Sequence, residues 1–297
     1  MIIKNIDDVT PAVLNVMQRT EDPRLREILV ALVKHLHGFA REVALTESEF
    51  QKGAVLAARL GQLTSDTHNE VVLMCGSLGL SQLICMMNNG TDTPKANSAS
   101  LLGPFWRLNS PSTENGASIV RSETPGAPLF FSGQVVDISG EPVPDAEVDI
   151  WHSSPTGFYE NQDSRQVDMN LRGKFTTDAK GRFAFRSVRP AGYPIPVNGV
   201  VGELLTAQGR HPYRPAHIHA LIFKPGYKTI AAQVYDPEDP YYDSDVQFGV
   251  TASLTGAFIR HDESHPNLPD MSRPWFSVDH RFTIEPGEAK LPRPPIR

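Results

Sequence analysis

The residues best suited to chemistry in this sequence are two histidines, His217 and His219, separated by a single isoleucine. They lie in the alternating segment 216–223, which predicts a β-strand that ends before Pro225 and Gly226. Alternate side chains of a strand project from one face, about 7 Å apart, so the two imidazoles could share a metal ion. Two half-buried histidines that only hydrogen-bond to the backbone would give the same pattern, so both interpretations remain open.

The surrounding residues restrict the kind of metal site. A cupin-type site would need a glutamate shortly after the two histidines, whereas the first acidic residue downstream is Asp236. A metal-dependent hydrolase barrel would need strands that alternate with helices, and this proline-rich region lacks that alternation. Neither Cys75 nor Cys85 stands near a histidine in a ligand spacing, so a structural zinc site is disfavoured.

Tyrosines flanked by glycine and proline offer another kind of ligand. Tyr159 follows Gly157, and Tyr193 stands between Gly192 and Pro194. A tyrosine phenolate is a hard oxygen ligand that suits Fe(III). Each tyrosine could equally be a packed anchor of its loop, so the residue types supply candidate ligands without assigning them.

Proline divides the chain into two regions, because the first 100 residues hold three of the 25 prolines and the remainder holds the other 22. Only the first third can therefore be mainly helical. There, Asp22 before Pro23 predicts one helix start, and Thr46 with Glu49 predicts a capping box that opens a second helix. Segment 66–87 is apolar enough to be buried on most sides. Apolar residues recur at helical spacing in the first helix: Leu25, Ile28, Leu29, Leu32, Val33 and Leu36. Helices this short cannot cover their own apolar faces, so they must pack on the rest of the chain, on another subunit, or on both.

The remaining two thirds have the pattern of a β protein. Strands are predicted within residues 131–138, 146–151, 174–185 and 216–223, each bounded by glycine and proline turn signals. Such spacing is typical of a β-sandwich or barrel. Segment 194–215 is too long for a hairpin turn, and long loops on a β scaffold commonly carry functional residues.

Composition and charge exclude several classes of protein. The 297 residues include 28 Lys and Arg against 34 Asp and Glu, a formal net charge of −6 with no basic block, so nucleic-acid binding is not expected. The longest apolar stretches, such as Val71–Cys75, are too short to span a bilayer, and the first residues lack a signal-peptide pattern. With two cysteines and no disulfide framework, we expect a cytoplasmic protein without membrane insertion.

Three segments resemble motifs of the intradiol ring-cleaving dioxygenases. They are Trp151–Tyr159; Tyr193–Pro196 with Val201 and Gly202; and Gly209–His219. The N-terminal region is similar to the catechol and hydroxyquinol 1,2-dioxygenase branch of this family, at Glu47–Phe50, Gly61 with Gln62, and Leu78–Ser81. The resemblance covers roughly residues 20 to 290, with the motifs in the family's order, so chance is a poor explanation.

The resemblance implies a site of non-haem Fe(III), one per subunit. Four side chains would hold the iron: Tyr159, Tyr193, His217 and His219. In the implied reaction a catecholic substrate binds through two oxygens, Tyr193 leaves the metal and accepts a substrate proton, and O₂ cleaves the ring to a muconate-type diacid. Arg214 would stabilise negative charge that develops on the ring, and a salt bridge to a nearby acid is its alternative role. Gln233 matches a glutamine beside the metal histidines.

The resemblance also implies which residues line the substrate pocket: Leu73, Gly76, Leu101, Leu102, Gly103, Pro104, Phe105, Ile195, Pro196 and Arg214. Segments 199–205 and 242–250 are closer to hydroxyquinol than to catechol 1,2-dioxygenases, which predicts benzene-1,2,4-triol as substrate and maleylacetate (3-hydroxy-cis,cis-muconate) as product. Many relatives have an aspartate where this chain has Gly76, so we expect extra space there that admits a bulkier catechol. Catechol and alkyl- or chlorocatechols are the alternative substrates.

The fold class implied is α+β, with an N-terminal helical dimerisation and linker domain followed by a mainly β-sandwich catalytic domain. The predicted limits are residues 1–103 and 104–297. We expect a homodimer formed through the N-terminal helices, with a phospholipid bound between them as in relatives of this branch. A non-catalytic β-sandwich binding module is the alternative of another class, and it is disfavoured because all four ligand positions are filled.

Overall fold

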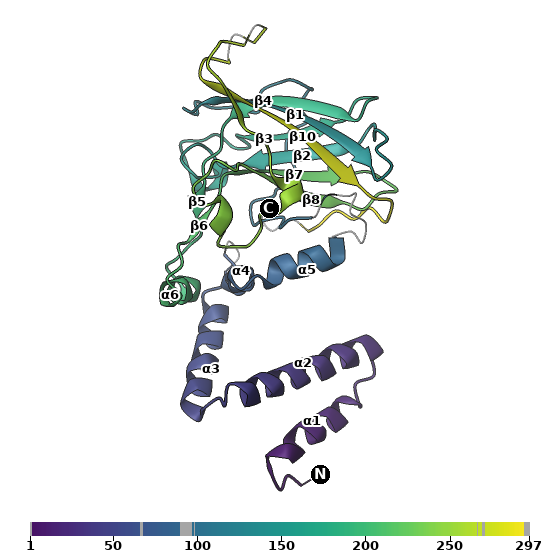
Figure 1. Ribbon diagram of the computed structural model, residues 1–297, viewed down its shortest axis with the longest axis vertical. Coiled ribbons are helices and arrows are strands. Elements are labelled where there is room, and N and C mark those ends of the chain that lie inside the picture. Colours follow the sequence, from purple (N-terminus) through teal and green to yellow (C-terminus); the bar gives the residue numbers. More distant parts are fainter. Residues whose placement is uncertain are drawn as a thin grey trace. The chain divides into compact units, whose positions relative to one another are not determined.

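The computed structural model describes residues 2–65, 68–89, 97, 99–265, 267–268 and 271–293 (Figure 1). They form two compact units, one that ends at Gln62 and one that begins at Leu63. The predicted α+β organisation, helices followed by a sheet-rich region, is confirmed. The predicted limits at residues 103 and 104 separate a dimerisation domain from a catalytic domain. They describe function rather than compact units, and they stay a prediction.

The first unit is helical. Its elements are η1 (Ile6–Asp8), α1 (Val9–Met17), α2 (Pro23–Glu42) and α3 (Glu47–Gln62). Both predicted helix starts are confirmed, since the Asp22 carboxylate accepts the backbone N–H groups of Arg24 and Leu25 at 2.8 and 3.2 Å. Thr46 and Glu49 form the reciprocal capping box, in which the Thr46 backbone N–H donates to Glu49 at 2.9 Å. None of the described residues in these four helices is buried.

One face of α2 carries a row of exposed apolar side chains, here called the α2 stripe. Its members recur every three or four residues and are each 46–55% exposed: Leu25, Ile28, Leu32, Leu36, Phe39 and Val43. A helix with one apolar face gains most of its stability by packing that face on another apolar surface. The described residues of this unit do not supply such a surface.

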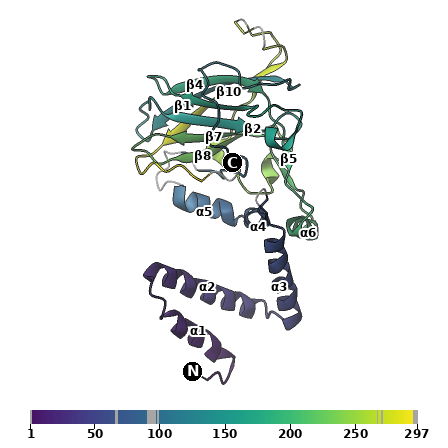
Figure 2. The same ribbon diagram turned by 180° about the vertical axis from the view of Figure 1, so that it is seen from behind.

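The second unit contains a β-sandwich of two four-stranded sheets, as predicted (Figures 1 and 2). The first sheet has the order β4–β1–β10–β9, from β1 (Pro128–Asp137), β4 (Arg182–Val188), β9 (Ile259–His261) and β10 (Trp275–Ile284). The second has the order β3–β2–β7–β8, from β2 (Glu147–His152), β3 (Arg172–Thr176), β7 (His217–Phe223) and β8 (Ile230–Tyr235). A separate two-stranded ladder joins β5 (Tyr193–Pro194) to β6 (Tyr213–Arg214). Short 3₁₀ helices are η2 (Glu160–Gln162), η3 (Tyr242–Ser244) and η4 (Ala252–Leu254).

Some strands that are neighbours in the chain lie in different sheets. β1 pairs with β4 and, in parallel, with β10, whereas β2 pairs with β3 and β7. The turns from β1 to β2 and from β3 to β4 therefore cross between the sheets, and each sheet contributes aromatic side chains to the core. Phe185 of the first sheet stacks on Phe131 of the same sheet at 5.0 Å and on Phe175 of the second sheet at 5.5 Å between ring centroids.

The described residues of the second unit also form the α-helices α4 (Glu70–Ser77), α5 (Leu80–Asn89) and α6 (Val200–Ala207). Figures 1 and 2 show α4 and α5 beside the β7–β8 side of the sandwich, with α6 next to α4. The helical backbone is interrupted between α4 and α5 at Gly79, which has a φ of +75°. Segment 66–87, of which residues 66 and 67 lie outside the described residues, is not buried on most sides. That prediction is wrong because α5 is amphipathic and leaves Leu83 and Met87 56% and 74% exposed.

Among the described residues, no single helix is long and apolar enough to cross a membrane. Helices α4 and α5 meet that length and composition only as a pair, and an 81° bend separates them.

Candidate active site

The four predicted metal ligands come from three places in the second unit. His217 and His219 lie on one face of β7, while the alternate residues Ile218 and Ala220 face the sandwich core. Tyr193 lies in β5, and Tyr159 directly precedes η2. All four residues are buried, and the two tyrosines pack with Trp106, Trp151 and Leu221 in one apolar cluster.

The structure brings the ligand atoms of these four residues together. Tyr159 Oη lies 3.4 Å from Tyr193 Oη, Tyr193 Oη lies 3.5 Å from His217 Nε2, and the two histidine Nε2 atoms are 3.2 Å apart. Ligand atoms held by one ion at about 2.0–2.1 Å, with angles of about 90–120°, are separated by roughly 2.9–3.6 Å. All three separations fall in that interval, so the cluster fits a single metal ion.

The protonation states also fit a metal. Burial, together with the charge of Arg214, lowers the pKa of His217 to about 3. Its Nδ1 is 2.7 Å from the Pro215 carbonyl, an arrangement that leaves the Nε2 lone pair free for a metal. Burial and the neighbouring His217 likewise hold the pKa of His219 well below its usual value.

The Tyr159 phenol needs a strong positive charge beside it to ionise. Burial, and then Tyr193, raises the pKa of Tyr159 well above its ordinary value. Two phenolates and two imidazoles make a hard donor set of the kind that a trivalent iron prefers. In the described part of the chain, no group of three or more His, Cys, Asp or Glu side chains could hold a metal ion. A metal at this site would therefore depend on both tyrosines.

Aromatic contacts and a close backbone approach hold the ligand rings. The His219 ring stacks on Trp151 at 4.6 Å between centroids, and the Tyr159 ring stacks on Phe105 at 4.3 Å. Gly103 has a φ of +77°, and a Cβ at this position would lie 3.0 Å from His219 Cε1. The loop can pass this close to the ligand only because residue 103 has no side chain.

Arg214 and Gln233 belong to a buried polar network next to the ligands. Arg214 Nη2 donates to Asp245 Oδ2 at 3.0 Å, to Gln233 Oε1 at 2.8 Å and to Tyr235 Oη at 2.8 Å. Although burial opposes its charge, Asp245 holds the pKa of Arg214 well above its usual value. Gln233 faces His219 across the β7–β8 ladder and donates to the Leu101 carbonyl. The salt bridge considered as the alternative role of Arg214 is thus present, and it fixes the guanidinium within the site.

Sequence reasoning missed Asp245 and Tyr235 in this network. Tyr235 could have been found, because it alternates with Gln233 on β8 and pairs with His217 in the ladder. Asp245 follows η3 in a loop, where no periodic signal predicts its direction.

The predicted pocket residues are only partly gathered. Leu102 and Phe105 pack against the aromatic cluster of the ligands, and Ile195 is buried. Leu73, Leu101 and Gly103 are half-buried, whereas Pro104 and Pro196 are exposed.

The space predicted at Gly76 is filled. An ideal Cβ on Gly76 would lie only 1.8 Å from Oε1 of Gln247. The expectation that the missing side chain opens room for a bulkier substrate is therefore wrong, because Gln247 occupies that room. Sequence reasoning did not find Gln247, which is 171 positions away along the chain.

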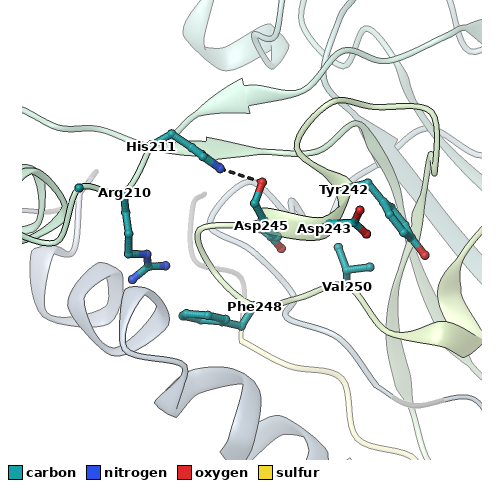
Figure 3. Close-up of a pocket in the computed structure, with 9 residues that line it drawn as sticks. Arg210, His211, Tyr242, Asp243, Asp245, Phe248 and Val250 are labelled. Atoms are coloured by element: carbon teal, nitrogen blue, oxygen red, sulfur yellow. Dashed lines mark hydrogen bonds between the residues drawn. The ribbon is translucent and has the colours of Figure 1, made fainter.

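A cavity of about 540 Å³ borders the polar network of Arg214 at Asp245 (Figure 3). Nine residues line it, among them Arg210, His211, Phe248 and Asp245, and none of the four candidate ligands is among them. Arg210 Nη1 donates to the Ser77 carbonyl at 2.7 Å and Nη2 donates to the Val246 carbonyl at 2.9 Å. Arg210 thus ties the end of α4 to the loop that carries Asp245.

Comparison with known proteins identifies the family of this chain. Family models described as "Dioxygenase" and "Catechol dioxygenase N terminus" match residues 101–284 and 22–95. The hydroxyquinol 1,2-dioxygenase of Rhizobium sp. (strain MTP-10005) is 38% identical over 90% of this chain and 91% of its own length. The catechol 1,2-dioxygenase of Candida albicans is 37% identical, over 83% of this chain and 82% of its own. The structure of hydroxyquinol 1,2-dioxygenase from Pseudomonas putida DLL-E4 superposes with a TM-score of 0.88 at 33% identity, and covers 95% of this chain and 98% of that one.

Proposed function

Because the chain belongs to the intradiol ring-cleaving dioxygenases, we propose that it opens hydroxyquinol (benzene-1,2,4-triol) between the two adjacent hydroxylated carbons. One O₂ is consumed and both of its atoms enter the product, 3-hydroxy-cis,cis-muconate, which is the enol form of maleylacetate. The observation that carries this proposal is the gathering of Tyr159, Tyr193, His217 and His219 around one point. The family uses non-haem iron, and we propose one Fe(III) per subunit held by these four side chains.

When bound, Fe(III) would accept two substrate oxygens and activate the ring toward O₂. The chain's own residues then have separate tasks. Tyr193 is the ligand best suited to accept a substrate proton, because it is 9% exposed while Tyr159 is 1% exposed. It also lies in the small β5–β6 ladder rather than in either large sheet. We expect Tyr193 Oη to take one hydroxyl proton as the diol binds, while Tyr159 and His219 keep their positions.

Arg214 supplies a fixed positive charge in the site. Its partners Asp245, Gln233 and Tyr235 hold it in one orientation before the substrate arrives, so no reorganisation is needed when negative charge develops on the ring. Gln233 positions Arg214 by accepting a hydrogen bond from its Nη2 group. Gln233 is held in turn by the hydrogen bond that it donates to the Leu101 carbonyl.

Catechol, or an alkyl- or chlorocatechol, is the alternative substrate, since a relative 37% identical is named a catechol 1,2-dioxygenase. A non-catalytic binding module is the alternative of another class. The intact donor cluster argues against it, because a binding module would have no reason to keep two buried phenols beside two neutral imidazoles.

The α2 stripe supports a further part of the proposal, a homodimer formed through the N-terminal helices. Six exposed apolar side chains on one helix face are better explained by a second copy than by solvent. We propose that a phospholipid binds between these helices in the dimer and that the protein works in the cytoplasm.

The test is the visible absorption spectrum of the purified protein before and after anaerobic addition of hydroxyquinol or catechol. Tyrosinate bound to Fe(III) should give a red charge-transfer band that shifts to longer wavelength when a diol chelates the iron. Tyr159→Phe should weaken or abolish the band, whereas Tyr227→Phe, in the turn between β7 and β8, should leave it unchanged. A colourless wild-type protein with stoichiometric zinc would overturn the iron assignment.

A further inference from the structure

We propose that Gln247 is a specificity-determining residue and that its side-chain amide hydrogen-bonds to the third hydroxyl of the substrate. This rests on the proposed function, and it concerns the wall of the site formed by the end of α4. No sequence motif singles out Gln247, whose importance follows from where the structure places its side chain.

The first observation is the complementarity between Gly76 and Gln247. A Cβ on Gly76 would meet Gln247 Oε1 at 1.8 Å and Cδ at 2.7 Å, so the carboxamide fills the space of a side chain at position 76. Gly76 is buried, and Gln247 is 8% exposed. The pocket wall predicted at position 76 is therefore polar, and its polar group comes from the Gln247 side chain.

The second observation is that this amide is held in one orientation. Gln247 Nε2 donates to Ser77 Oγ at 3.0 Å, and the Gln247 backbone N–H donates to Asp245 Oδ1 at 3.1 Å. Arg210, whose guanidinium lies 4.8 Å from the centre of the Phe248 ring, is drawn beside that ring in Figure 3. It bonds both Ser77 and Val246 and so closes the α4 end onto this loop. With Nε2 engaged, Oε1 points over Gly76.

The third observation is an unused acceptor. Among the described residues, none donates a hydrogen bond to Gln247 Oε1. The two donors of this residue, its backbone N–H and its side-chain Nε2, each have an acceptor. Gln247 Oε1 does not count among the described buried polar atoms without a partner, so it remains accessible to a donor from outside the chain. A hydroxyl group of the substrate would supply that donor, and a catechol, which lacks the third hydroxyl, would not.

The fourth observation links the loop that carries Gln247 to the candidate ligands. Asp245, which accepts the Gln247 N–H, also binds Arg214, and Arg214 binds Gln233 opposite His219. The loop that carries Gln247 therefore holds the guanidinium on which the substrate ring depends. Sites built to bond a hydroxyl discriminate strongly against analogues that lack it, because the buried polar group is then left unpaired.

The experiment compares kcat/KM for hydroxyquinol and for catechol in the wild-type holoenzyme and in Gln247→Met, which keeps the size of the side chain but removes its amide. We expect the preference for hydroxyquinol to fall about 10- to 100-fold, mainly through hydroxyquinol, with iron content and the visible band unchanged. Gln51→Met, on the exposed surface of α3, is the matched control and should keep the wild-type preference. Equal losses for both substrates would show that Gln247 only packs, and would overturn the inference.

Gly76→Ala approaches the same contact from the other side. Its methyl group would overlap Oε1 and displace the carboxamide, so the preference for hydroxyquinol should fall as it does in Gln247→Met. In a Gln247→Ala background the added methyl group should cause no further loss of preference. Independent, additive effects of the two substitutions would contradict the inference.

The proposed function is tested separately, by the substrate preference of the wild-type protein alone. A wild-type protein that turns over catechol but not hydroxyquinol would overturn the proposed substrate, and with it the role of Gln247. A wild type that prefers hydroxyquinol, with Gln247→Met keeping the same preference, would overturn the inference and leave the proposed function standing.

Discussion

The two units of this protein distribute polar and apolar groups in opposite ways. In the first unit, none of the described helical residues is buried, and the α2 stripe turns apolar side chains outward. In the second unit, charged and polar side chains such as Arg214, Asp245 and Gln233 are buried beside an aromatic core. One unit therefore has apolar surface that lacks a partner, and the other has buried polar groups with specific partners.

Single substitutions should therefore act differently in the two units. A change to a buried, paired group removes a hydrogen bond or charge that no solvent can replace. Such a change should therefore lower both the stability of the fold and the rate of turnover. A change to an exposed apolar side chain costs the isolated unit little and acts on association.

Asp245→Asn should have the largest effect. It leaves the Arg214 charge buried without its carboxylate, and removing one partner of a buried ion pair costs about 3–5 kcal/mol. Although burial opposes ionisation, Arg214 holds the pKa of Asp245 below its usual value, so this carboxylate is charged at neutral pH. We expect the free energy of unfolding, measured by urea denaturation, to fall by about that amount and turnover to fall with it.

Asp243→Asn is the matched control, because Asp243 lies two positions away and is exposed. It should change the free energy of unfolding by less than about 0.5 kcal/mol. If both variants were equally stable, the buried pair would contribute nothing and the contrast between the units would fail.

Asp149 should make stability depend on pH. Trp106 Nε1 donates to its Oδ2 at 3.0 Å, but Oδ1 has no partner among the described residues. Burial raises the pKa of Asp149 to about 6 from 3.8, so the folded state binds the proton more tightly than the unfolded chain does. Stability is therefore lost as pH rises from about 4 to 6, and ionisation costs about 3 kcal/mol in total.

Asp149→Asn removes this ionisation and keeps an acceptor for Trp106. The difference in unfolding free energy between the variant and the wild type, followed from pH 4 to pH 7, should move in favour of the variant by about 2 kcal/mol of that total. A difference that stays constant across this range would show that the carboxyl titrates normally in the fold. Buried histidines such as His152 affect both proteins alike and cancel in the comparison.

The sequence predicted most reliably what depends on local order. Strand alternation placed His217 and His219 on one face, and capping residues placed two helix starts correctly. The resemblance to a family supplied Tyr159 and Tyr193, which no spacing rule links to the histidines. Strand alternation did not reveal that β1 and β2, neighbours in the chain, belong to different sheets, because pairing partners are chosen by burial across the whole sandwich.

The sequence could not supply contacts between distant irregular segments. Gln247 fills the space over Gly76 and Arg210 bonds to Ser77, yet each pair joins a loop to a helix more than 130 residues earlier. A missing side chain at position 76 predicts a void only if nothing else enters it. Which neighbour enters is decided by packing density, and packing is a property of the fold rather than of a motif.

Glu70→Gln should have a smaller effect than the buried pair. The Glu70 carboxylate accepts the Val201 backbone N–H at 2.9 Å and so caps α6, whose own N-cap residue is Gly199. A glutamine can still accept that hydrogen bond but loses the charge that favours a helix N-terminus and the contact with His68 at 2.6 Å. We expect a loss of about 1 kcal/mol in unfolding free energy. Glu141→Gln, in an exposed turn, is the control and should be neutral, and an equal effect of the two variants would exclude a capping role.

Leu32→Glu combined with Leu36→Glu should have the smallest effect on the folded chain and the clearest effect on assembly. Both residues lie in the middle of the α2 stripe and are 50% and 55% exposed. Carboxylates there would have to be desolvated without partners in a dimer interface, whereas in a monomer they stay in water. Sedimentation velocity should show a wild-type dimer and a double-variant monomer at micromolar concentration, with unchanged iron content and turnover per iron.

Lys34→Glu, on α2 but outside the stripe, carries a similar change in charge and should leave the dimer intact. A double variant that still sedimented as a dimer would mean that the stripe is not the interface. Another surface of the chain would then have to supply the contact, and the contrast between the α2 stripe and the catalytic unit would not hold.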